Sequence, residues 1–118
     1  MPASNIENEF VSYAVELMQS LGPVRAKRMF GGHGIFLEDL MFALVSNNTL
    51  YLKADKETIN EFKEKELVAF TYNKKGKEFI MSYYQAPEDA LEDSDEMNYW
   101  ANKAYGAALR AASIKRKK

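Results

Sequence analysis

The sequence predicts an α+β domain in which helices pack on one antiparallel sheet, in the order α-β-β-β-β-α-β-β-α. Amphipathic helical segments lie at the two ends of the chain and frame runs of apolar residues that are typical of strands. Short polar turns separate neighbouring strands, a spacing that favours hairpins over parallel crossovers. We expect residues 1–118 to form a single domain, with residues 115–118 as a frayed basic tail.

The composition excludes several classes of protein. The chain has 118 residues, of which 47% are hydrophobic and 28% charged, as is ordinary for one globular domain. It has no cysteine and one histidine, which excludes disulfides, thiol nucleophiles and multi-histidine metal sites. The formal charge of -1 disfavours a uniformly basic nucleic-acid binder. No segment resembles a membrane span or a signal peptide, so we expect a cytoplasmic protein without membrane contact.

The first helix is expected from about Asn5 to Leu21. Ser4 and Glu7 have the spacing of a capping box, and Gly22-Pro23 supplies a typical helix end. Apolar residues at helical spacing form its buried stripe: Ile6, Phe10, Tyr13, Ala14, Leu17 and Leu21.

Four strands are expected next, as an antiparallel meander. The polar pairs Glu38-Asp39 and Asn47-Asn48 suit hairpin turns, since asparagine tolerates the left-handed conformation. The expected strands are Val24 to Phe30, Ile35 to Leu37, Leu40 to Val45 and Thr49 to Lys53.

The second half of the chain predicts a helix, a hairpin and a final helix. Asp55 is a plausible N-cap for a short polar helix from about Lys56 to Lys65. Pro87 suits the first position of a helical turn, and Asp93 or Ser94 caps the last helix, which should run to about Ile114. The hairpin is expected to pair Ala69 to Tyr72 with Glu78 to Gln85 through a turn at Asn73 to Gly76.

Several of the expected strands are apolar on both faces, whereas a sheet covered on one side should alternate more cleanly. Three helices, one of them short and polar, do not suffice to cover both faces. A homodimer or a protein partner would bury the remaining apolar surface.

The glycine-rich corner Gly31-Gly32-His33-Gly34 is a candidate ligand site. It lacks the Gly-Lys-Ser/Thr of a phosphate loop, and a strand follows it where a dinucleotide fingerprint needs a helix. The favoured interpretation is structural: Met29, Phe30, Gly31, Gly32 and Gly34 shape a bend. His33 would then be a corner histidine, and a small-ligand or enzyme role for it remains an alternative. No catalytic set, cofactor or metal is expected.

Charged clusters give two further alternatives. A nucleic-acid contact would use Arg25, Lys27, Arg28 and the tail, extended by Lys103 and Arg110; the bland interpretation is a solubilising tail. The tail residues are Lys115, Arg116, Lys117 and Lys118. Six carboxylates surround the start of the last helix, where they suit a solvated cap better than a cation site. These are Glu88, Asp89, Glu92, Asp93, Asp95 and Glu96.

Five segments together resemble the N-terminal domain of the TfoX/Sxy family: Arg28 to Phe36, Met41 to Val45, Leu50 to Lys53, Phe70 to Tyr72 and Met81 to Glu88. The resemblance covers about Phe10 to Ala112. It implies an α+β fold like that of secretion chaperones, and a non-enzymatic role connected with competence for DNA uptake. The family's regulators also carry a C-terminal helical domain. We therefore expect a standalone N-terminal domain that acts as a regulatory or protein-interaction module.

Overall fold

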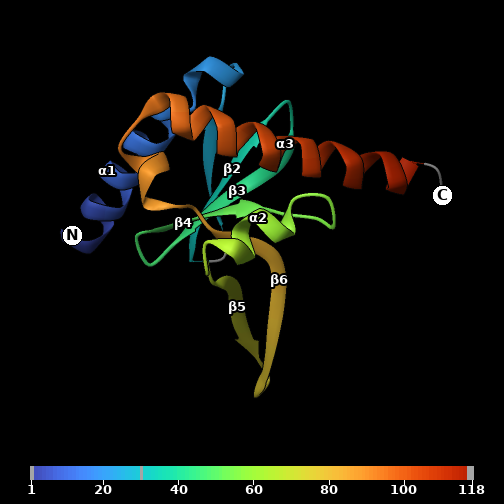
Figure 1. The fold of residues 1–118 in the computed structure, drawn as a ribbon. Coiled ribbons are helices and arrows are strands. Elements are labelled where there is room, and N and C mark those ends of the chain that lie inside the picture. Colours follow the sequence, from blue (N-terminus) through green and yellow to red (C-terminus); the bar gives the residue numbers. More distant parts are fainter. Residues whose placement is uncertain (1, 30, 117–118) are drawn as a thin grey trace.

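The computed structural model describes residues 2–29 and 31–116, which form one six-stranded antiparallel sheet and three α-helices (Figure 1). The strand order is β1-β2-β3-β4-β6-β5, so β1 and β5 are the edges. This confirms the predicted α+β class and the predicted order of elements. The helices are α1 (Pro2–Leu17), α2 (Ile59–Glu64) and α3 (Ser94–Arg116), with 3-10 turns η1 (Gln19–Leu21) and η2 (Glu88–Leu91).

The strands are joined mainly by tight two-residue turns. All six turn residues have positive φ. The values are 50° and 67° for Glu38-Asp39, 52° and 57° for Asn47-Asn48, and 53° and 80° for Lys75-Gly76. Two positive φ values give the turn whose twist matches that of the flanking strands. The last turn has two residues instead of the four expected, so β5 and β6 are longer than predicted. The strands are β1 (Arg25–Met29), β2 (Gly32–Leu37), β3 (Leu40–Ser46), β4 (Thr49–Lys53), β5 (Ala69–Lys74) and β6 (Lys77–Gln85).

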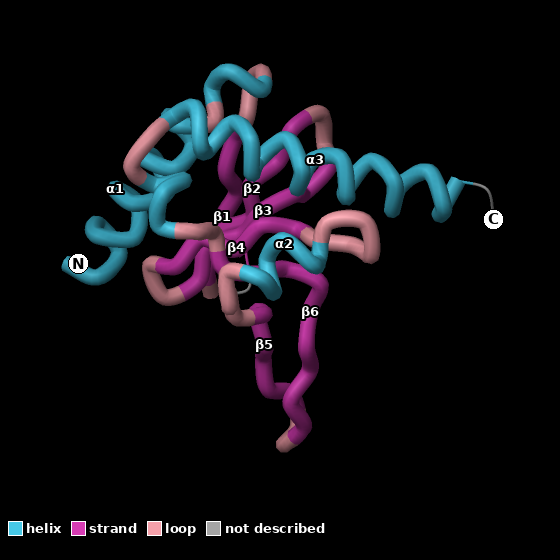
Figure 2. Tube along the Cα trace, in the orientation of Figure 1, coloured by secondary structure: helices cyan, strands magenta, loops and turns pink. Residues whose placement is uncertain are grey.

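The three helices share one core on one side of the sheet. Ala14 and Met18 from the α1 region pack with Trp100 of α3, and α3 crosses β3 and β4. Phe62, the fully buried residue of α2, lies 5.2 Å from the Trp100 ring and 5.7 Å from that of Tyr84. The β5–β6 hairpin projects away from this helical layer (Figure 2).

The ends of α1 and α2 differ from the prediction. α1 begins at Pro2, which suits a first helical position, so Ser4 is not its cap. It ends at Leu17, and only a 3-10 turn continues to Leu21. α2 begins at Ile59 because Asp55 first folds a turn: its side chain accepts the Glu57 amide at 3.1 Å and its carbonyl accepts the Ile59 amide at 2.8 Å.

The last helix begins as expected and ends later than expected. Asp93 caps it, accepting the Asp95 amide on its side chain at 3.4 Å and the Met97 amide on its carbonyl at 2.9 Å. The helical backbone continues to Arg116, so half of the expected tail is helical, while Lys117 and Lys118 lie outside the described residues. No helix in residues 2–29 and 31–116 is long and apolar enough to cross a membrane.

Candidate interaction surface

The pairing register assigns each strand residue to one of two faces. Ala26, Ile35, Ala43, Leu52 and Tyr84 align across the sheet, and all but Ala26 belong to or pack on the core beneath the helices. The next row is Lys27, Gly34, Leu44, Tyr51 and Gln85. Because neighbouring residues of a strand point to opposite sides, this row lies on the face without helices, which we call the open face.

The open face is apolar although no helix packs on it. Leu44 and Tyr83 are buried there but do not belong to the helix-side core, so neighbouring side chains close over them. The other large apolar residues of the open face are half-buried or exposed. They are Met29, Phe36, Met41, Tyr51, Phe70, Tyr72, Phe79 and Met81.

The aromatic rings on the open face pack against one another. Tyr51 and Phe70 meet edge to face with centroids 5.0 Å apart, which joins β4 to the projecting hairpin. Tyr72 and Phe79 stack at 5.4 Å near the hairpin tip, each 41% exposed. A shallow hollow lined by Phe70, Tyr72, Asn73 and Met81 lies between these pairs. The hairpin therefore extends the apolar surface beyond the helical layer.

Two of the corner glycines are required by close packing. A Cβ on Gly32 would lie 2.2 Å from the Val45 carbonyl oxygen. A Cβ on Gly34 would lie 2.7 Å from Met29 Sδ and 2.9 Å from Met41 Sδ. These side chains fill the space that the missing Cβ leaves.

The corner itself is shorter than the sequence indicated, because β2 begins at Gly32 and not at Ile35. Gly31, with φ of 76°, is the turn residue, and Phe30 lies outside the described residues. His33 aligns with Arg28 and Val45, so it is half-buried on the helix side while Gly32 and Gly34 face the open side. The histidine side chain therefore lies on the opposite face of the sheet from the space over Gly32 and Gly34, and a ligand site at this corner stays a prediction.

Tyr83 and Lys53 link β6 to β4 on the open face. The Lys53 Nζ lies 5.0 Å from the centroid of the Tyr83 ring, a cation–π contact. The Tyr83 hydroxyl donates to the Met41 carbonyl at 3.4 Å, and burial raises the pKa of Tyr83 to about 12. Burial also lowers the pKa of Lys53, while the Asp55 carboxylate acts in the opposite direction.

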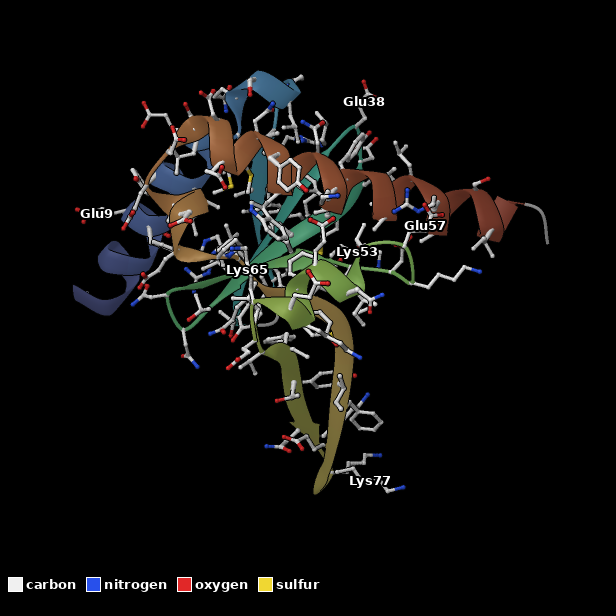
Figure 3. All side chains as sticks on the ribbon, in the orientation of Figure 1. Glu9, Glu38, Lys53, Glu57, Lys65 and Lys77 are labelled. Carbon is white, nitrogen blue, oxygen red and sulfur yellow. The ribbon has the colours of Figure 1, made fainter. Side chains whose placement is uncertain are left out.

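The charged side chains at the strand positions of the open face are all positive. Among the described residues, its strand positions carry no aspartate or glutamate, and its cations are Arg25, Lys27, Lys53, Lys74 and Lys77. Figure 3 shows Lys77 at the hairpin tip, far from the helices. Of these five cations, only Arg25 has a salt bridge to a described residue, at 3.2 Å to Asp39 in the β2–β3 turn. The surface is thus apolar with a cationic border.

The three basic residues predicted on the first strand do not share a face. Arg28 aligns with His33 on the helix side, whereas Arg25 and Lys27 lie on the open face. The side chains of Lys115 and Arg116 are not among those described. A nucleic-acid contact that uses these residues stays a prediction, and its strand residues would act from two sides of the sheet.

The helix cations Lys103 and Arg110 are held by carboxylates. Arg110 binds Asp55 through Nε at 2.6 Å and Nη2 at 3.1 Å, and the hydrogen bond from Arg110 lowers the pKa of Asp55. Lys103 binds Glu61 at 2.5 Å, while the Tyr99 hydroxyl donates to the same carboxylate at 2.7 Å. Hydrogen bonds from Lys103 and then Tyr99 lower the pKa of Glu61. These pairs fasten α2 and its preceding turn to α3, so neither cation extends a free basic surface.

The acidic cluster around the start of α3 is exposed and acts on the helix end. Asp93 caps α3, and Asp95 and Glu96 follow in its first turn, where carboxylates complement the helix dipole. In the described part of the chain, no group of three or more histidine, aspartate or glutamate side chains is arranged to hold a metal ion.

Sequence reasoning anticipated an uncovered apolar surface on the sheet but could not say which residues form it. The missing information is the register between strands, which decides the face of each residue. One signal was available in the sequence: Arg25, Lys27 and Met29 are two residues apart, so they lie on the same face of a strand. Arg28 obscured this pattern because it is a polar residue on the other face.

Comparisons with known proteins agree with the resemblance seen in the sequence. The TfoX N-terminal domain family model matches residues 16–108. Protein Sxy of Escherichia coli (strain K12) is 26% identical over 100 residues, which are 85% of this chain and 48% of that protein. The DNA transformation protein TfoX of Haemophilus influenzae is 32% identical over 95 residues, 79% of this chain and 44% of that protein.

A third relative, the DNA transformation protein TfoX1 of Aliivibrio fischeri, is 32% identical over 85 residues, which are 72% of this chain and 39% of that protein. The chain thus spans less than half the length of each of these relatives. The family match covers most of the described fold, from the last two residues of α1 to residue 108 of α3. The chain therefore belongs to the TfoX N-terminal domain family.

Proposed function

We propose that the chain is a non-enzymatic protein-interaction module in the regulation of DNA transformation, and that it works in the cytoplasm. Two relatives bear the name of DNA transformation protein, and the family match over residues 16–108 includes the whole described sheet. The observation that carries the interaction role is the open face, an apolar surface with all helices on the other side of the sheet. Such surfaces mark sites where proteins bind one another.

Site-specific photo-crosslinking in the cell tests whether the open face is the working surface. Tyr72 on the open face and Tyr99 on α3 are 41% and 49% exposed, so each can be replaced by the crosslinker benzoylphenylalanine with similar access to solvent. We expect a discrete protein adduct from position 72 and none from position 99. Adducts from position 99 alone, or from neither position, contradict the proposed surface.

The regulatory role is tested separately. Removing the chain from its own cell should change the frequency of transformation by marked DNA, and restoring it should reverse the change. Restoring a variant with Tyr72→Asp and Met81→Asp, which places two carboxylates in the hollow of the open face, should not reverse it. An unchanged transformation frequency without the chain contradicts the role, whatever the crosslinking shows.

A further inference from the structure

We propose that the open face binds an acidic amphipathic segment of a protein partner, in which carboxylates alternate with apolar residues. This inference rests on the proposed function, because it names the chemistry of the partner at the same surface. Four features carry it: the sign of the charges, the kind of apolar side chains, the packing of the rings, and the symmetry of a contact between two copies.

Four of the five cations of the open face have no salt bridge to any described residue. In residues 2–29 and 31–116, no carboxylate lies within salt-bridge distance of Lys27, Lys74 or Lys77, and Arg25 has one pair, with Asp39. A neutral apolar partner would strip water from these ammonium groups without replacing it, which is unfavourable. A partner with carboxylates over the border would pair them instead, so charge complementarity selects an acidic segment.

The apolar part of the surface suits a protein segment. Met29, Met41 and Met81 contribute flexible thioether side chains, which adapt to partners of different shape. They lie among aromatic rings from β2 to β6, a width that accommodates a helix or strand with one apolar side.

A single-stranded nucleic acid fits this surface less well, although it is also anionic. Bases stack on open ring faces, whereas Tyr51 and Phe70 pack edge to face and the Tyr83 ring lies beneath Lys53. Tyr72 and Phe79 are more exposed but stack on each other. Methionine offers no flat surface to a base, so most of the open face cannot act as a stacking platform.

A symmetric dimer through the open face is also disfavoured. A two-fold contact brings the same surface of both copies together. Here it would set one cationic border against another, because the strand positions of this face carry no carboxylate within the described ranges. Like charges at an interface weaken association. The open face therefore binds a segment of different charge and not the open face of a second copy.

The test selects random 16-residue peptides displayed on phage against the intact chain. We expect selected peptides to carry a net negative charge with interspersed apolar residues, and to bind more weakly as salt rises. The double variant Lys27→Glu with Lys74→Glu should weaken binding by at least about tenfold. The double variant Arg28→Glu with Lys63→Glu makes the same change of charge away from the open face, and should stay within about twofold. Circular dichroism confirms that both variants are folded.

Several outcomes overturn the inference. Selected peptides that are neutral or basic, no enrichment at all, or equal losses in the two double variants contradict the acidic segment. An oligothymidylate of 20 nucleotides is tested by fluorescence anisotropy. If it binds tightly, and if Lys27→Glu with Lys74→Glu abolishes this binding while the control variant does not, the partner is a nucleic acid. If light scattering finds a dimer of the parent chain, and if the variant Lys27→Glu with Lys74→Glu dissociates it, the partner is a second copy of the chain. The proposed function survives these failures when crosslinking at position 72 still yields a protein adduct.

Discussion

Replacing Gly32 by alanine should destabilise the fold strongly, because the added methyl group meets backbone rather than a side chain. The new Cβ would lie 2.2 Å from the Val45 carbonyl oxygen and 3.3 Å from its carbonyl carbon. No rotamer change relieves this contact, so β2 and β3 must separate where they pair. Overpacking a well-packed site costs about 1–3 kcal/mol, and a backbone clash belongs at the upper end. We expect a loss of about 3 kcal/mol in the free energy of unfolding.

Thermal unfolding measures this loss directly. A chain of this length has an unfolding entropy of about 0.25 kcal/mol/K, so 3 kcal/mol corresponds to a fall of about 12 °C in Tm. Gly106→Ala is the matched control, since its Cβ in α3 meets only the Arg110 guanidinium at 3.4 Å. Alanine favours a helix over glycine by about 1 kcal/mol, so Tm should rise by about 4 °C. A Gly32→Ala variant within 2 °C of the parent would refute the close approach of β2 to the Val45 carbonyl.

Three further outcomes follow from buried and paired groups. Phe62→Ala should lower the free energy of unfolding by about 3–5 kcal/mol in chemical denaturation, because Phe62 is fully buried against Trp100 and Tyr84. Burial raises the folded pKa of Tyr83 to about 12 from 10.0, so its contribution to stability is complete below pH 10 and is lost as the pH rises through 10 towards 12. Absorbance at 295 nm should show a late-titrating component that Tyr83→Phe reduces, while Tyr105, whose pKa burial also raises, remains. The hydrogen bond from Arg110 lowers the folded pKa of Asp55 below 3.8, so stability from this pair is present above pH 3.8 and is lost on acidification below it. The loss is at most about 1 kcal/mol for this partly exposed pair. Arg110→Gln should reduce it in urea unfolding at pH 6 and pH 3, while the backbone amides of Glu57 and Thr58 still stabilise the carboxylate.

The sequence predicted elements well where local chemistry decides them. Asn47-Asn48 and Glu38-Asp39 form the two-residue turns expected of them, and Asp93 caps α3. The start of β2 was missed because glycine is normally a sign of irregular backbone. Gly32 and Gly34 instead lie within a regular strand. Glycine is needed there because a Cβ would clash with Val45, Met29 or Met41 from other strands. Such tertiary contacts leave no trace in the local sequence.

The existence of the candidate surface could be predicted from the sequence, but its residues could not, for the same reason. Apolar runs in the sequence indicated that some face of the sheet would stay uncovered, which the structure confirms. The extra residue opposite Ile35 and Phe36, where the β2–β3 register shifts, changes which side chains of β3 align with those of β2. That irregularity depends on the packing of two strands, so alternation along β3 alone could not give the faces correctly.

Net charge concealed how the charges are arranged. The chain has a formal charge of -1, yet residues 88–96 carry six carboxylates and no cation, while the strand positions of the open face carry five cations and no carboxylate among the residues described. In a strand, a shift of one residue moves every side chain to the other face. A slipped β1 would bring Arg28 to the open face and withdraw Arg25 and Lys27. The tight fit of Gly32 beneath the Val45 carbonyl holds β2, the partner of β1, in place on β3. The register of β1 on β2, which pairs Lys27 with Gly34 and Arg28 with His33, in turn decides which charges a partner meets.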